Sequence, residues 1–172
     1  AFGRDEWSNE EKSYLVYFSF PEKVTKIGNS AFNGTMLSGA LIIPNDVVEI
    51  GDHAFAKTNI SSLELPHNLK KIDGWAFENC ASLSGNLSLP ESLESLGDSA
   101  FSNCKLLSGT LTIPSKIKEI PNWCFHNCGF TGDLTIPEGV VKIGSFAFHN
   151  CSQLKGRLSL PISLREMKED AF

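Results

Sequence analysis

The sequence lacks the features that mark several large classes of protein. Among its 172 residues, no apolar run approaches the roughly 18 residues of a membrane-spanning helix. Lysine and arginine number only 15 against 20 aspartates and glutamates, and they form no basic run of the kind that binds nucleic acid. We therefore expect no membrane insertion within this segment and no nucleic-acid partner.

Motifs that would indicate catalysis are also missing. The chain has no serine-centred nucleophile elbow, no glycine-rich phosphate loop and no HExxH zinc motif. Its composition, 41% hydrophobic and 20% charged, is ordinary for one soluble folded unit. We predict a protein that is not an enzyme, with no catalytic residues and no cofactor.

An internal repeat organises the chain. Seven prolines recur at nearly equal intervals, and a phenylalanine follows each of them at one constant spacing, as Phe32 follows Pro21. The prolines are Pro21, Pro44, Pro66, Pro90, Pro114, Pro137 and Pro161. The phenylalanines are Phe32, Phe55, Phe77, Phe101, Phe125, Phe148 and Phe172. Only the connection from each phenylalanine to the next proline varies in length, so insertions and deletions collect there, as they do in loops.

Each unit has the pattern of one short strand followed by a corner. An alternating L-x-[IL] pattern precedes the proline, as at residues 111–113, and this is the period of a half-buried strand. Proline closes the strand because it has no backbone donor. A unit of about 23 residues cannot bury its own apolar face, but stacked units cover one another. The pattern predicts a repeat solenoid with the Ala-Phe and aliphatic positions in its core.

Units such as LTIPEGVVKIGSFAFHNCSQL (residues 134–154) resemble the BspA-like class of leucine-rich repeats of bacterial and protist surface proteins. The resemblance covers residues 14–172 as seven repeats of about 23 residues each, the last one incomplete. It implies a right-handed array with a parallel β-sheet on the concave side and short strands and turns on the convex side. It also implies a secreted or cell-surface protein used in adhesion or protein recognition. Residues 1–13 are expected to form an N-terminal cap or the end of a preceding repeat.

The stretch NWCFHNCGF (residues 122–130) places two cysteines four residues apart around a histidine, as in a metal or thiol site. The repeat assigns these cysteines to different columns. Cys128 falls in register with Cys80, Cys104 and Cys151, whereas Cys124 occupies an alanine position. We expect free, buried thiols, although the distance between neighbouring units does not exclude a disulfide.

The two histidines that follow motif phenylalanines, His126 and His149, are expected to be neighbours. Without a carboxylate in phase they make a poor metal site, so we predict no metal. Asn79, Asn103, Asn127 and Asn150 form a further column, interpreted as an asparagine ladder at a turn.

Two sets of residues remain as candidates for binding. The first faces outward from the concave sheet, and solenoids characteristically bind through such extended surfaces. It comprises Ile42, Glu64, Ser88, Thr112, Asp133, Thr135, Arg157 and Ser159. A solvated sheet also tolerates such residues without binding anything, so both interpretations stay open. The second set precedes the motif alanine: Trp75, Trp123 and Phe146, which are either exposed interface anchors or the packed floor of a loop.

These observations favour a protein-recognition or adhesion module, extracellular or on the cell surface, that binds a protein such as a host extracellular-matrix or surface protein. The alternatives are a structural spacer or substrate-recognition arm of a larger surface protein and, third, a thiol or metal protein. Because Ala171 and Phe172 end the chain in mid-unit without a polar cap, we also expect end-to-end self-association through this last repeat.

Overall fold

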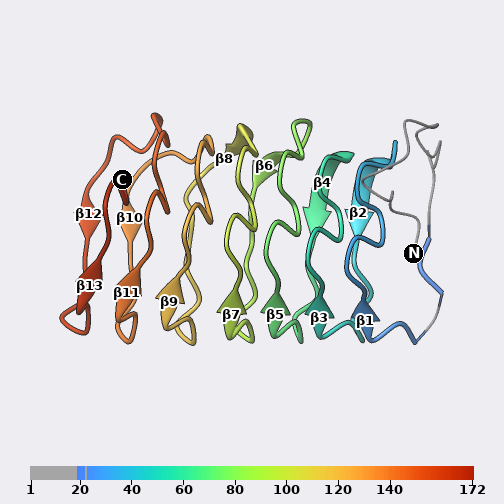
Figure 1. The fold of residues 1–172 in the computed structure, drawn as a ribbon, viewed down its shortest axis with the longest axis horizontal. Helices are drawn as coiled ribbons and strands as arrows, with labels where there is room; N and C mark the ends of the chain where they lie inside the picture. The colour runs from blue at the N-terminus through green and yellow to red at the C-terminus, as the bar shows by residue number, and fades with distance from the viewer. Residues whose placement is uncertain (1–18, 22) are drawn as a thin grey trace.

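The computed structural model describes residues 19–21 and 23–172, which wind into a solenoid of parallel strands. Successive turns follow one another along the long axis, from the N-terminal turns at one end to the C-terminal turns at the other (Figure 1). These residues contain no helix, and therefore none long and apolar enough to cross a membrane. The predicted repeat solenoid is confirmed, whereas the cap expected at residues 1–13 lies outside the described residues.

One row of strands, which we call the charged row, runs the length of the solenoid. It contains β1 (Lys26–Ile27), β3 (Glu49–Ile50), β5 (Lys71–Ile72), β7 (Ser95–Leu96), β9 (Glu119–Ile120), β11 (Lys142–Ile143) and β13 (Glu166–Met167). The strands pair in the orders β1-β3-β5-β7 and β13-β11-β9. Each strand points an isoleucine, leucine or methionine one way and a polar residue the other, as strand geometry requires. The polar residues of the charged row therefore share one face.

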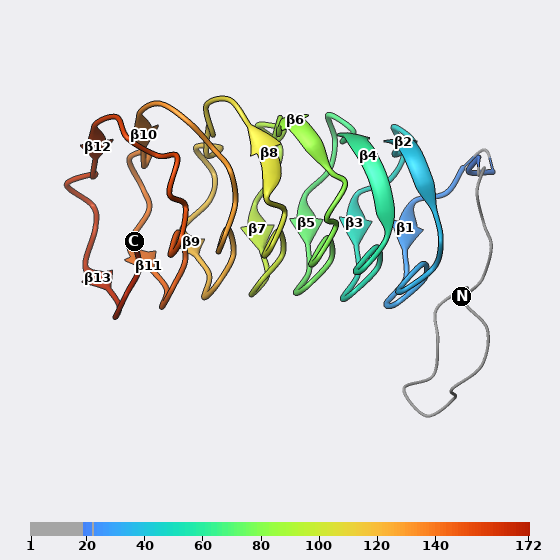
Figure 2. The same ribbon diagram turned by 90° about the horizontal axis from the view of Figure 1, so that it is seen from above.

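A second row, the proline-side row, lies across the solenoid from the first (Figure 2). It contains β2 (Ser38–Ile42), β4 (Asn59–Glu64), β6 (Ser84–Asn86), β8 (Leu106–Ser108), β10 (Leu134–Thr135) and β12 (Leu158–Ser159). These strands pair only two at a time, β2 with β4, β6 with β8 and β10 with β12, and one isolated bridge joins Thr112 to Thr135. In the fourth and fifth units, whose connections are equal in length, the strands β6 and β8 lie earlier than the L-x-[IL] pattern predicts and pair with each other.

A column of stacked phenylalanines fills the interior. Successive ring centroids from Phe32 to Phe172 lie 5.1 to 5.9 Å apart, and the ring planes differ by 2° to 17°. The neighbouring alanine positions are fully buried in the inner turns, where Cys124 fills one of them with 0% exposure, whereas Ala31 in the first unit is only partly buried. Such small side chains leave room for a ring in every turn. The predicted core is confirmed at the Ala-Phe positions of the inner turns and at aliphatic positions such as Val47 and Ile50, whereas Phe172 at the end of the column is 42% exposed.

Candidate functional site

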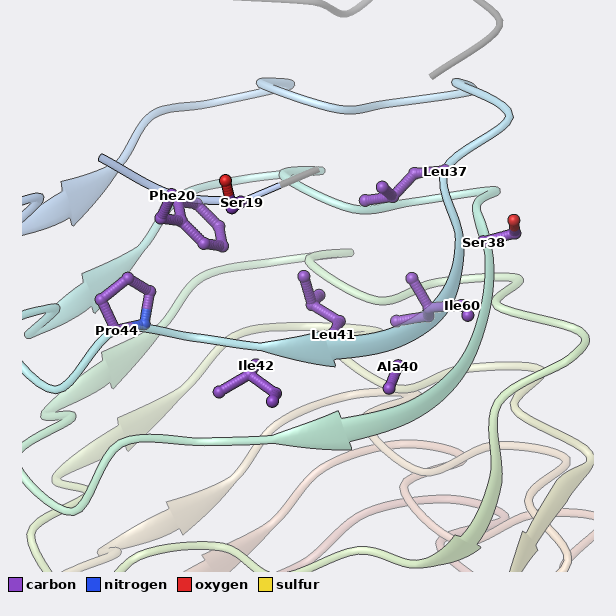
Figure 3. Close-up of a pocket in the computed structure, with 10 residues that line it drawn as sticks. Ser19, Phe20, Leu37, Ser38, Ala40, Leu41, Ile42, Pro44 and Ile60 are labelled. Carbon is purple, nitrogen blue, oxygen red and sulfur yellow. The ribbon is translucent and has the colours of Figure 1, made fainter. Parts of the chain in front are cut away.

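The residues predicted to face outward from the proline-side row are all exposed. We call this set the strand face: Ile42, Glu64, Ser88, Thr112, Asp133, Thr135, Arg157 and Ser159. Strand alternation accounts for the exposure, since Ile42 is 62% exposed between Leu41 at 5% and Ile43 at 2%. Leu41 and Ile42 point to opposite sides of β2 (Figure 3).

Strand pairing brings several of these residues together. Ile42 lies opposite Glu64, and Thr135 lies opposite both Thr112 and Ser159. Asp133 and Arg157 form an exposed ion pair, with 3.9 Å between Arg157 Nε and Asp133 Oδ2. It is the single ion pair that the described residues show on the strand face. The carboxylate of Glu64 therefore has no ion-pair partner among the residues that the structure describes.

The charged row differs because its charges are paired within the solenoid. Lys26 Nζ lies 2.8 Å from Glu49 Oε1, and Lys142 Nζ lies 3.5 Å from Glu119 Oε2 in adjacent turns. The hydrogen bond from Lys26 lowers the pKa of Glu49. Lys71 lies 2.8 Å from Asp73, whose hydrogen bond raises the pKa of Lys71. With these charges already compensated, the charged row offers less to a partner than the strand face does.

Two hollows open on the side of the solenoid that carries the strand face. The first, about 430 Å³, is lined by residues that include Phe20, Leu41, Ile42 and Pro44 (Figure 3). The second, about 400 Å³, lies between the third and fourth units. Its lining consists of Leu63, Glu64, Leu65, His67, Ser88, Pro90, Glu91 and Ser92. The prediction from sequence included Glu64 and Ser88 but missed the other six.

A signal for the second hollow was present in the repeat lengths. The connection from Phe55 to Pro66 is the shortest in the chain, and the next one, from Phe77 to Pro90, is longer by two positions. Every other pair of neighbouring connections differs by one position or none. The hollow lies where these two connections are side by side.

The aromatic residues before the motif alanine pack against one another yet stay partly exposed. Trp123 stacks on Phe146 with 4.1 Å between ring centroids, and Trp75 stacks on His53 with 5.1 Å. The two tryptophans nevertheless remain 38% and 36% exposed. All four of these residues have φ between 52° and 58°, a left-handed conformation that bulky residues rarely adopt. The backbone of the repeat therefore holds these four rings toward the surface.

The histidine and asparagine columns are arranged as predicted. The rings of His126 and His149 are parallel to within 4°, with centroids 5.5 Å apart. Burial lowers the pKa of His126, and His149 and Lys105 lower it further. Asn127 donates from Nδ2 to Asn103 Oδ1 at 2.8 Å, and Asn150 donates to Asn127 at 2.9 Å. The described residues contain no group of three or more side chains that could hold a metal ion.

The cysteines are free thiols that hydrogen-bond to the backbone of the preceding turn. Cys80 Sγ donates to Phe55 O at 3.2 Å, and Cys151 Sγ donates to Phe125 O at 3.0 Å. Burial raises the pKa of Cys80 and of Cys151 to about 11, from an ordinary value of 9.0. Since the thiolate is the reactive form, these side chains are poor nucleophiles at neutral pH. Cys80, Cys104, Cys128 and Cys151, which we call the thiol column, therefore pack the core of the solenoid.

The buried thiols predict a specific reactivity and pH dependence. With a pKa of about 11 in place of 9.0, the thiolate fraction of Cys80 at pH 8 falls about 100-fold, so Ellman's reagent should label the native chain at least that much more slowly than the unfolded chain. Because the folded pKa is raised, the thiols stabilise the fold below pH 9, and this contribution is lost as the pH rises from 9 to 11. Urea unfolding at pH 7, 9 and 10.5 checks the trend, and rapid labelling of native protein would contradict it.

The last turn exposes apolar side chains that earlier turns bury. Leu158 and Met167 are 46% and 54% exposed, whereas Leu134 and Ile143, one turn earlier, are 3% and 0% exposed. An apolar face of this kind is able to pair with another chain. The end-to-end self-association expected from the sequence stays a prediction.

A family model described as "BspA type Leucine rich repeat region" matches residues 9–131 and 131–172, with six copies of the repeat. No curated protein matches the chain. A leucine-rich repeat protein from T. pallidum is similar in structure, with a TM-score of 0.70, 28% identity, and coverage of 91% of this chain and 73% of that one.

Two further bacterial structures are similar. A leucine-rich repeat protein from Bacteroides ovatus has a TM-score of 0.61 and 22% identity over 89% of this chain and 56% of that one. A leucine rich cell surface protein from Faecalibacterium prausnitzii has a TM-score of 0.55 and 25% identity over 86% of this chain and 46% of that one. The present chain thus spans about half the length of these two proteins.

Proposed function

The chain belongs to the BspA-type leucine-rich repeat family, and we propose that it is a protein-recognition module that binds its partner through the strand face. Repeats of this family suggest protein interaction and are generally non-enzymatic. The observation that carries the choice of surface is the contrast between the two rows of strands. Charges of the charged row pair across adjacent turns, whereas the strand face presents exposed side chains next to two hollows.

We further propose that the module works in adhesion, outside the cell or on its surface. The similarity to a Faecalibacterium prausnitzii protein described as a cell surface protein supports this location. The proposed partner is a host extracellular-matrix or surface protein. An extended sheet face suits a protein partner, since a solenoid surface several strands wide can cover the roughly 800 Å² per partner of a standard interface.

Arginine substitutions at the middle of the strand face test the proposal. Thr112 and Thr135 lie opposite each other in adjacent turns, so Thr112→Arg and Thr135→Arg place long charged side chains at the centre of the surface. We expect each change to weaken binding to a responsive member of a panel of extracellular-matrix proteins by at least about tenfold, measured by surface plasmon resonance.

The matched control is Ser95→Arg, which adds the same charge at an exposed hydroxyl residue of the charged row. It should leave the affinity within about twofold, because the exposed face of that row is outside the proposed interface. Equal loss in Ser95→Arg and Thr112→Arg would refute the strand face as the binding surface. Absence of binding across the whole panel would instead favour the structural spacer.

A further inference from the structure

We infer that the hollow between the third and fourth units receives an arginine side chain of the protein partner. This inference rests on the proposed function, since the hollow shares Glu64 and Ser88 with the strand face. It specifies the side chain that the partner must place at one point of that surface.

The hollow is a consequence of the unequal connections on its two sides. Strand β4 pairs with β2, and β6 pairs with β8, so the proline-side row is broken between β4 and β6. Leu63 and Leu65 beside this break are only partly buried, whereas the equivalent Leu87 and Leu89 of the next unit are 3% and 8% exposed. The break therefore leaves an open cavity of about 400 Å³ with apolar side chains in its lining. This volume lies within the range of about 300–1,000 Å³ that is typical of ligand sites.

The charges that line the hollow are negative and belong to both of its walls. Glu64 comes from the end of β4, and Glu91 follows Pro90 on the opposite wall. Neither carboxylate has an ion-pair partner among residues 19–21 and 23–172. Glu91 accepts only long hydrogen bonds from Ser115, of 3.4 Å from the amide nitrogen and 3.3 Å from the hydroxyl. Of the described residues, no lysine or arginine lines the hollow.

This combination of lining residues matches the two parts of an arginine side chain. The methylene stem of arginine covers apolar surface well, here that of Leu63, Leu65 and Pro90. Its planar guanidinium carries donors on both edges, so one group can hydrogen-bond to carboxylates on two walls. A lysine ammonium is a compact point charge without this fork, and an anionic side chain would be repelled. Arginine is also enriched at protein interfaces.

The test uses a small arginine probe and its neutral counterpart. N-acetyl-arginine N-methylamide is titrated into the ¹⁵N-labelled chain, alongside the citrulline analogue, which has nearly the same shape without the charge. We expect saturable amide shifts at hollow residues such as Leu65 and Ser92, with a Kd on the order of 1 mM. Citrulline should bind at least about tenfold more weakly, because it loses charge-assisted hydrogen bonds.

Charge-matched variants test whether the arginine probe binds at the hollow. The double variant Glu64→Gln and Glu91→Gln should lose arginine binding by at least about tenfold. The control Glu94→Gln with Glu119→Gln removes the same charge at exposed positions outside the hollow and should change the Kd less than twofold. Thermal unfolding within about 2 °C of the parent shows that both variants fold. Equal binding of citrulline, equal loss in the control, or shifts spread over all acidic residues would each overturn the inference.

The two proposals fail in different ways. Partner binding that is lost in Thr112→Arg but unchanged in the Glu64→Gln and Glu91→Gln variant overturns the arginine site and leaves the proposed function intact. Arginine binding at the hollow with no effect of Thr112→Arg on the protein partner supports the arginine site and overturns the strand face as the interface.

Discussion

Replacing Phe101 with alanine is expected to lower the free energy of unfolding by about 4 kcal/mol, one of the largest effects of any single change in this chain. Phe101 is fully buried, and its ring stacks on Phe77 and Phe125 with centroid distances of 5.2 and 5.9 Å. Alanine would remove the apolar contacts of the ring, interrupt two stacking pairs and leave a cavity. The turns on either side are held by their own hydrogen bonds and cannot close the space at no cost.

Because Phe101 lies in the middle of the stack, its replacement should lower the free energy of unfolding by more than the size of the side chain alone would predict. Each turn of a solenoid contacts only its neighbours, so the interface that Phe101 fills is what couples the N-terminal turns to the C-terminal turns. Urea unfolding followed by circular dichroism measures the change. The matched control is Phe172→Ala at the end of the same column, where the ring is 42% exposed and stacks on Phe148 alone. We expect that change to cost less than about 1.5 kcal/mol, and equal costs at the two sites would contradict the account.

The fold could be predicted from the sequence because the same requirement recurs in every unit. The phenylalanine column has one residue type at a fixed distance from the proline in every unit, and the cysteine and asparagine positions keep one residue type over four consecutive units. Stacking then places repeated residues side by side. The left-handed backbone at the position before the motif alanine was not predicted. Trp75, Ser99 and Phe146 all adopt it, and these three residue types share no preference for that conformation. Here the tertiary stacking overrides the local tendency of the residue.

The candidate site was predictable only where it follows strand alternation. Exposure of Thr112 and Thr135 follows from the period of two, because their neighbours are buried. The hollow beside Glu64 and Glu91 depends on a difference between two connections, and such a difference is invisible when each unit is compared with the consensus. The second hollow therefore coincides with an irregularity between neighbouring units rather than with a departure from the repeat within one unit.

The close approach of neighbouring turns at Gly97 predicts a second large effect on the free energy of unfolding. A Cβ added there would lie 2.5 Å from the carbonyl carbon of Asp73 and 2.6 Å from the Cα of Gly74, both backbone atoms of the preceding turn. This backbone directly follows the paired strands β5 and β7, and Asp73 N donates to Ile50 O at 2.9 Å, which holds it in place. Gly97→Ala should therefore force the two turns apart and lower the free energy of unfolding by about 3 kcal/mol.

Gly28 supplies the control for Gly97 because it occupies the same motif position in the first unit. A Cβ at Gly28 would meet no atom of the described residues within 4 Å, and neither glycine has a positive φ, so the two substitutions differ in steric contact and not in backbone strain. We expect Gly28→Ala to be neutral or to stabilise the fold by up to about 1 kcal/mol, since alanine restricts the unfolded chain. Chemical denaturation of both variants under one set of conditions decides the matter. Equal loss at both positions would mean that the motif glycine is required for its backbone conformation, whereas loss at Gly97 alone shows that the spacing between turns sets the requirement.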